Sequence, residues 1–84
     1  MKLFMLDQEV NIDHDTYDAV VVAAETEEEA RWIHPSEYEH QGKWDGKTEK
    51  YSTWCAVEDV HVRYLGEAAE GTEKGIILAS FNAG

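Results

Sequence analysis

Four histidines and eighteen acidic residues make up most of the side chains of this 84-residue chain that could bind a metal ion. Their spacing matches none of the recognised zinc motifs. His34 and His40 are the pair that the segment between them could bring together, but histidines scattered in this way are ordinary surface or core residues. We therefore predict no metal site and no other cofactor.

A comparison with the calcium-binding loop motif also excludes a calcium site. Asp13, Asp15 and Asp18 have the spacing that begins a calcium-binding loop. The sixth position is then Asp18 where the loop requires Gly, and the twelfth is Ala24 where it requires Glu. These aspartates are better explained as a charged turn, in which Asp13 or Asp15 caps backbone amides.

The chain also lacks recognisable catalytic motifs. Cys55 is the only cysteine, so it cannot form an intramolecular disulfide, and as a nucleophile it would need a base such as His61 close by. The simpler interpretation of Cys55 is a small buried hydrophobic residue. The sequence has no glycine-rich phosphate loop and no serine nucleophile elbow, and no pattern places a carboxylate in an apolar pocket. We predict a protein that is not an enzyme.

The uneven distribution of acidic residues is the main functional signal. Residues 1–34 carry nine acids against Lys2 and Arg31, a net charge of -7, whereas residues 35–84 carry only -4. A surface of closely spaced carboxylates can occupy the basic groove of a nucleic-acid-binding protein. The alternative is a charged surface that only keeps a small protein soluble. The predicted partner-binding residues are Asp7, Glu9, Asp13, Asp15, Asp18, Glu27, Glu28 and Trp44.

Large aromatic residues bracket the irregular segment 36–53, and Trp and Tyr often anchor interfaces. They are Trp32, Tyr38, Trp44, Tyr51 and Trp54. We expect Trp32 and Trp54 to pack in the core, and Trp44, which lies between Lys43 and Asp45, to be exposed. This aromatic loop could alternatively form a pocket for a small molecule such as a nucleotide signal.

The first half of the chain contains two predicted strands and one helix. Alternating apolar residues predict a strand over 2–12, with Phe4, Leu6, Val10 and Ile12 on one face, and a central strand over 17–24 pairs with it as a hairpin. Thr26 and Glu29 form a predicted capping box that begins a helix of two to three turns, and the helix ends at His34 before Pro35.

The second half adds two strands, over 58–65 and 75–81, joined by residues 67–74 in a loose hairpin. The predicted fold is therefore one α+β domain over 1–84, with ββαββ order and a four-stranded, mostly antiparallel sheet. One short helix cannot cover such a sheet. The aromatic loop, a second copy of the chain in a homodimer, or a partner must cover the rest.

Charge and hydropathy exclude several partners. A net charge of -11 repels the phosphate backbone of nucleic acids and anionic membrane surfaces. No apolar run approaches the roughly 20 residues of a membrane-spanning helix, and Met1 to Leu6 is followed by acidic residues instead of a signal-peptide core. We predict a cytoplasmic protein.

The stretch from Val21 to Arg31, followed by Ile33-His34-Pro35 and by Gly66-Glu67-Ala68-Ala69, resembles short uncharacterised accessory proteins of tailed bacteriophages and prophages. The resemblance implies an accessory protein made in an infected bacterium, a class that includes small acidic inhibitors of host defence. Our hypothesis is a phage-type protein that binds a basic host protein, such as a defence or nucleic-acid-handling protein, through its acidic face. The alternatives are a small-molecule-sequestering protein and a structural homo-oligomer.

Overall fold

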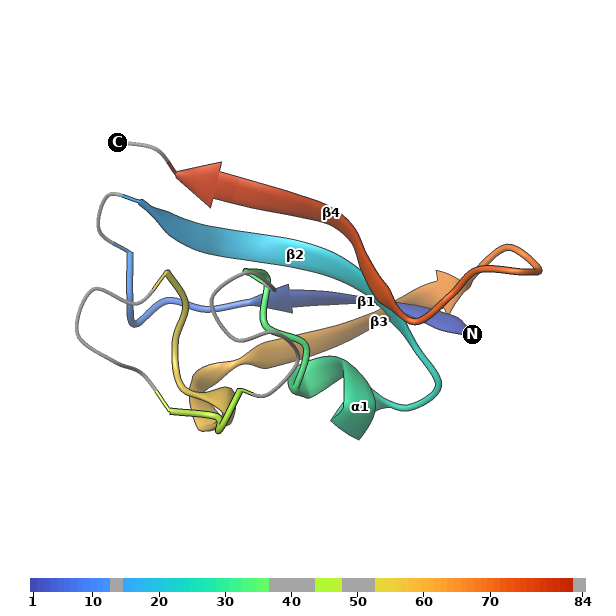
Figure 1. Ribbon diagram of the computed structural model, residues 1–84, viewed down its shortest axis with the longest axis horizontal. Coiled ribbons are helices and arrows are strands. Elements are labelled where there is room, and N and C mark those ends of the chain that lie inside the picture. Colours follow the sequence, from blue (N-terminus) through green and yellow to red (C-terminus); the bar gives the residue numbers. More distant parts are fainter. Residues whose placement is uncertain (13–14, 37–43, 48–52, 83–84) are drawn as a thin grey trace.

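The computed structural model describes residues 1–12, 15–36, 44–47 and 53–82, and it is built on one four-stranded antiparallel sheet. The strands follow the spatial order β3-β1-β2-β4 (Figure 1). The structure confirms the predicted α+β class and the ββαββ order. The elements are β1 (Lys2–Asp7), β2 (Thr16–Ala24), helix α1 (Glu27–Arg31), the 3-10 turn η1 (Val57–Asp59), β3 (His61–Glu67) and β4 (Gly75–Asn82).

Strands β1 and β2 form the predicted hairpin, in register from Lys2 opposite Ala24 to Asp7 opposite Ala19. The prediction that the first strand continues to residue 12 is wrong. Val10 and Ile12 are 62% and 67% exposed, because the chain leaves the sheet after Asp7. The cause is local: a side-chain amide bonds the backbone of the following residues and replaces the strand ladder, as described below.

The predicted hairpin between the last two strands is also wrong. Strands β3 and β4 occupy opposite edges, because β3 pairs with β1 and β4 pairs with β2. The connection between them crosses one end of the sheet, where the amide of Ala68 donates to the carbonyl of Met1 at 3.0 Å. Strands β1 and β2, which contain fully buried residues, form the centre of the sheet. Strand β3 pairs with the free edge of β1, and β4 pairs with the free edge of β2.

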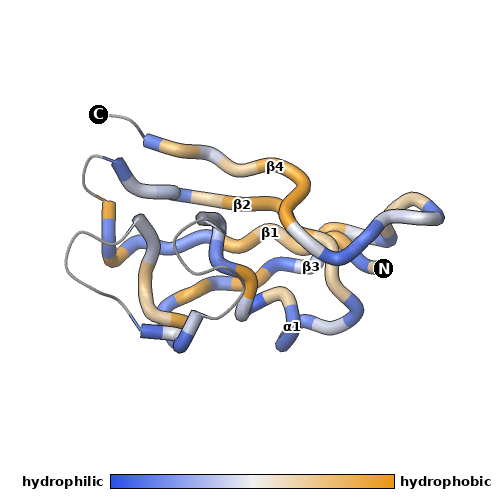
Figure 2. The backbone as a smooth tube through the Cα atoms, viewed as in Figure 1, coloured by the Kyte–Doolittle hydropathy of each residue, from blue (hydrophilic) through white to orange (hydrophobic). Residues whose placement is uncertain are grey.

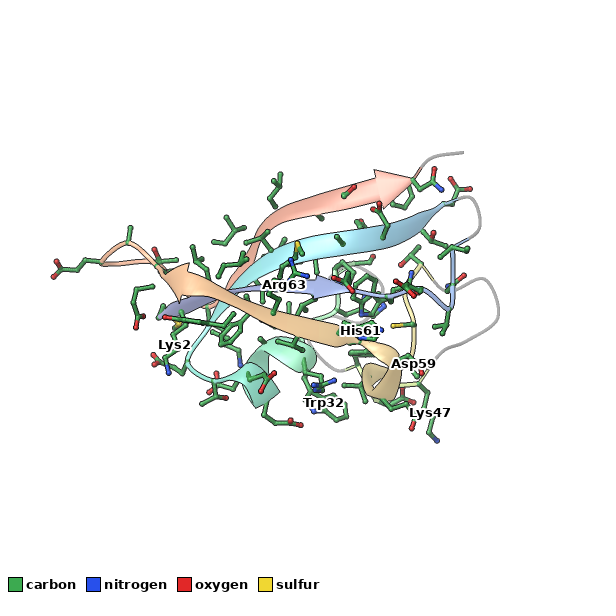
Figure 3. All side chains as sticks on the ribbon, turned by 180° about the vertical axis from the view of Figure 1, so that it is seen from behind. Lys2, Trp32, Lys47, Asp59, His61 and Arg63 are labelled. Atoms are coloured by element: carbon green, nitrogen blue, oxygen red, sulfur yellow. The ribbon has the colours of Figure 1, made fainter. Side chains whose placement is uncertain are left out.

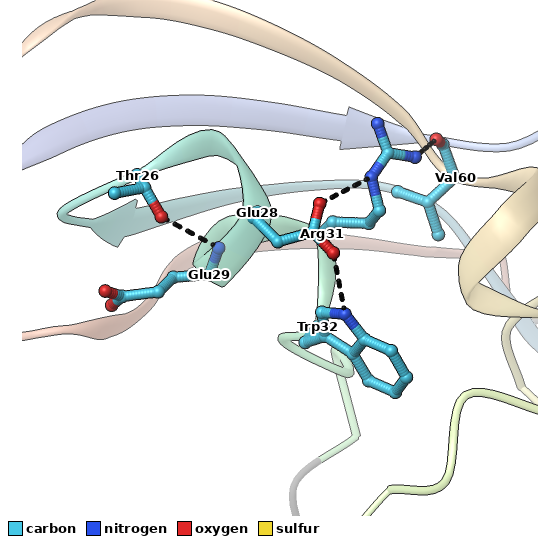
Figure 4. Close-up of polar contacts among 6 residues, drawn as sticks. All are labelled: Thr26, Glu28, Glu29, Arg31, Trp32 and Val60. Atoms are coloured by element: carbon cyan, nitrogen blue, oxygen red, sulfur yellow. Dashed lines mark hydrogen bonds and ion pairs between the residues drawn. The ribbon is translucent and has the colours of Figure 1, made fainter.

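Helix α1 begins as predicted but ends early. The hydroxyl of Thr26 accepts a hydrogen bond from the amide of Glu29 at 3.1 Å, which forms the N-cap (Figure 4). The other half of the predicted capping box differs, since the Glu29 carboxylate lies 3.4 Å from Nζ of Lys74. The helix stops at Arg31 and not at His34, and the amide of Trp32 bonds the carbonyl of Glu29 in a tighter last turn.

The core lies between one face of the sheet and a layer made by α1 and the segment that leads to β3 (Figure 1). Its largest fully buried side chains are Trp54, Leu6, Val20, Val22 and Cys55. The buried positions of Trp54 and Cys55 confirm two predictions. On the opposite face, Leu3, Met5 and Val21 are only half-buried. No helix within the described ranges is long and apolar enough to cross a bilayer.

Candidate functional site

The turn after β1 is organised by the side chain of Gln8, which is buried although it is polar. Its Nε2 donates to the carbonyls of Asn11 and Tyr17 at 2.6 and 3.0 Å. Its Oε1 accepts from the amides of Val10 and Asn11 at 3.0 and 2.8 Å. One amide group thus satisfies four backbone groups and connects the end of β1 to the start of β2.

Asn11 extends this network to the core. Its Nδ2 donates to the carbonyl of Trp54 at 2.7 Å, so the turn is attached to a fully buried residue of the opposite layer. Sequence reasoning missed both residues. The sequence did contain a signal. Gln8 follows Phe4 and Leu6 in the strand alternation, so its side chain points toward the core, and a buried polar side chain must find hydrogen-bond partners inside the protein.

This turn carries a group of carboxylates that we call the acidic hairpin end: Asp7, Glu9, Asp15 and Asp18. Glu9, Asp15 and Asp18 are exposed and Asp7 is half-buried, while the predicted Asp13 lies outside the described residues. Asp15 has a left-handed φ of 59°, and its amide donates to the carbonyl of Asn82 at 2.7 Å. In the described part of the chain, none of these four carboxylates forms an ion pair.

The predicted Glu27 and Glu28 do not belong to that group. Asp7 pairs with Ala19 and with His61 at one end of the sheet, whereas Lys2 pairs with Ala24 at the other, just before α1. Figure 3 shows His61 and Lys2 toward these two ends. Five residues of strand separate them by about 17 Å. The predicted acidic face is therefore divided into two regions.

Glu28 and Glu29 of the helix also have partners within the molecule. Glu28 accepts a hydrogen bond from Nε1 of Trp32 at 3.1 Å and lies 3.9 Å from Nε of Arg31 (Figure 4). Arg31 in turn donates from Nη1 to the carbonyl of Val60 at 2.7 Å. These contacts attach α1 to the start of β3. Within the described ranges, Glu28 and Glu29 therefore have cations close to them, whereas the acidic hairpin end has none.

Trp44 is buried, so the prediction that it is exposed is wrong. It is only 8% exposed, its ring centroid lies 5.9 Å from that of Trp32 and 5.0 Å from that of His34, and its Nε1 donates to the carbonyl of Lys47 at 3.1 Å. Trp32 is 44% exposed instead of buried, because the helix ends before it and its ring covers Gly46 from outside. The predicted loop residues Tyr38 and Tyr51 lie outside the described residues.

The buried thiol does not suit nucleophilic chemistry. Burial, with a smaller contribution from the negative charge of Asp59, raises the pKa of Cys55 from 9.0 to about 12, so the thiol stays protonated at neutral pH. Across residues 1–12, 15–36, 44–47 and 53–82, no three His, Cys, Asp or Glu side chains are placed to hold a metal ion. His40, one of the pair considered for a metal, lies outside those ranges.

A shallow hollow lies at the other end of the sheet, between α1 and β3. It has a volume of about 410 Å³ and is lined by Lys2, Phe4, Glu27 and Tyr64. The rings of Phe4 and Tyr64 are 5.8 Å apart and form part of its floor. The hollow places one cation beside one anion over aromatic carbon, but it is wide open to solvent and is not part of the aromatic loop.

The fold and these surfaces define a small acidic α+β protein with an open antiparallel sheet. No protein-family model, curated protein or solved structure matches the chain. The functional assignment therefore depends on the geometry of the chain itself.

Proposed function

We propose that this chain is a non-catalytic accessory protein of the phage type that binds a basic protein partner through the acidic hairpin end. The observation that supports this proposal is the combination of four carboxylates with a turn fixed by Gln8 and Asn11. Because these carboxylates have no cation of their own in the described structure, their negative charge is available to a partner.

The hydrogen-bonded turn matters for affinity. Carboxylates beside backbone that is held by internal hydrogen bonds, as it is around Gln8 and Asn11, lose little conformational entropy when they bind, so more of the electrostatic attraction appears as binding free energy. The same groups raise the rate of encounter with a positive surface and oppose binding to phosphate. A host defence or nucleic-acid-handling protein presents such a positive surface in its nucleic-acid groove, and occupation of that groove inhibits it.

Affinity capture from bacterial lysate at low and high salt tests this proposal. We expect a protein partner that is retained at low salt and released as salt screens the charges. The diagnostic variant combines Glu9→Lys, Asp15→Asn and Asp18→Lys, and it loses the partner. Asn is chosen for position 15 because it tolerates the left-handed φ of 59°.

A matched control changes the net charge by the same amount elsewhere. Glu70→Lys and Glu73→Lys with Glu25→Gln again combine two reversals and one neutralisation, at exposed positions near the opposite end of the sheet. The control variant keeps the partner if the acidic hairpin end is the binding surface. Equal loss in both variants shows a nonspecific charge effect and refutes the proposal.

A further inference from the structure

Strand β4 is an edge strand with an uncharged and largely exposed sequence. It runs from Gly75 to Asn82 as GIILASFN, and among the strands of the described residues it pairs with β2 alone, along one side. Ile77, Leu78 and Phe81 are 51%, 69% and 47% exposed. Figure 1 shows β4 at the top of the sheet, and Figure 2 shows that most of the strand is hydrophobic. An edge of this kind offers both unpaired backbone groups and apolar side chains to another strand.

The other edge is different. Strand β3 carries Arg63 and Glu67 among its seven residues, and charged side chains are a common protection against unwanted pairing. Strand β4 has no charge and no proline. Its pairing with residues 19–23 of β2 is interrupted once, by a shift in register beside Ile77. Leu78, Ala79 and Ser80 then pair regularly with β2.

We propose that β4 pairs antiparallel with β4 of a second copy of this chain, around a twofold axis near Leu78 and Ala79, to form one continuous eight-stranded sheet. The distribution of charge favours a second copy of the chain as the partner of β4. Each copy carries -11, so two copies repel each other except where their surfaces are neutral, and β4 is such a region. Strand β4 itself carries no carboxylate, so it does not attract a basic partner.

The two ends of the strand differ in charge. Lys74 precedes β4, and its Nζ lies 3.4 Å from the carboxylate of Glu29 in the same copy. Asp15 lies beside the other end of β4, on the β2 side, where its amide bonds the carbonyl of Asn82 at 2.7 Å. In an antiparallel pair the start of one strand lies beside the end of the other. Lys74 of each copy therefore lies beside the Asn82 end of the other copy, and its attraction to Asp15 acts across the width of one strand.

This proposal goes beyond the acidic hairpin end and has the opposite dependence on salt. Added salt weakens a complex between the acidic hairpin end and a basic partner. The same salt screens the repulsion between two copies of charge -11 and leaves backbone pairing intact, so the dimer is retained or strengthened. The two proposals can therefore fail separately.

Sedimentation equilibrium of the full chain over a wide range of concentrations tests the dimer. Leu78→Lys places like charges opposite each other near the axis, and we expect a rise in the dimer dissociation constant of about tenfold or more. The control is Leu65→Lys, at a half-exposed position on the other edge, which leaves the dissociation constant unchanged. A wild-type chain that stays monomeric at every concentration, or equal loss in both variants, overturns the proposal.

Hydrogen exchange of the wild-type chain gives a second test that needs no variant. We expect amide protection over residues 75–82 to increase with protein concentration, while protection over residues 61–67 does not change. Increased protection on β3 alone assigns the interface to the other edge and contradicts the proposal. This measurement decides the question even where Leu78→Lys fails to fold.

Discussion

Replacement of Gly46 by Ala tests how the segment before η1 is held against the helix. Gly46 has a left-handed φ of 82° and lies under the ring of Trp32. A Cβ atom at this position would lie 2.8 Å from Cη2 and Cζ3 of Trp32 and 2.9 Å from Cγ1 of Val57. The backbone cannot move away easily, because the carbonyl of Gly46 accepts from the amide of Val57 at 2.8 Å.

Two costs add at this position. A left-handed conformation costs a residue with a Cβ atom about 1–2 kcal/mol. Overpacking against a ring and a methyl group costs about 1–3 kcal/mol more. We therefore expect Gly46→Ala to lower the free energy of unfolding by about 2–5 kcal/mol, a large part of the total stability of a small domain.

Gly71→Ala is the matched control, because Gly71 has nearly the same φ of 87° but no atom within 4 Å of the added Cβ. It should cost only the conformational part, about 1–2 kcal/mol. Denaturant unfolding followed by tryptophan fluorescence measures both variants. Equal losses for Gly46→Ala and Gly71→Ala would refute the reasoning, because they would show that Trp32 and Val57 move away without cost.

Three further substitutions test other features. Gln8→Ala leaves four backbone groups of the turn without their partner, and we expect a loss of about 2–4 kcal/mol in denaturant unfolding; an unchanged midpoint contradicts the role of Gln8. Thr26→Ala removes the N-cap of α1 and should cost about 0.5–2 kcal/mol, measured in the same way. Burial raises the pKa of Cys55 from 9.0 to about 12, so the folded protein holds this proton more tightly than the unfolded chain. That contribution to stability is complete below pH 9 and is lost as the pH rises toward 12, so wild type should lose more stability over this range than Cys55→Ala.

Local signals predicted much of the fold. The β-branched centre of β2, the Thr26 cap and the apolar run of β4 each identify an element from neighbouring residues alone. The end of β1 was missed because Gln8 continues the strand alternation, and only its contacts with Asn11 and Tyr17 show that the chain turns there.

Features that depend on contacts between distant residues were not predictable. The order of strands depends on which edge of the β1–β2 hairpin β3 and β4 occupy, and sequence proximity wrongly favoured pairing between them. The exposure of Trp32 and the burial of Trp44 follow from the packing of Trp44 against Trp32 and His34, residues that are distant from it in the sequence. The acidic residues looked continuous in sequence, but the length of β2 separates Asp18 from Glu27 in space.

The position of β1 also determines when the chain can fold during synthesis. β1 pairs with β3, and residues 8–60 lie between these two strands, so the sheet cannot be completed until most of the chain has left the ribosome. Until then, the β1–β2 hairpin has two open apolar edges. Such late, non-local pairing slows folding and prolongs exposure to aggregation. Rapid translation at high expression levels should therefore favour inclusion bodies, and slower synthesis at lower temperature should increase the folded yield.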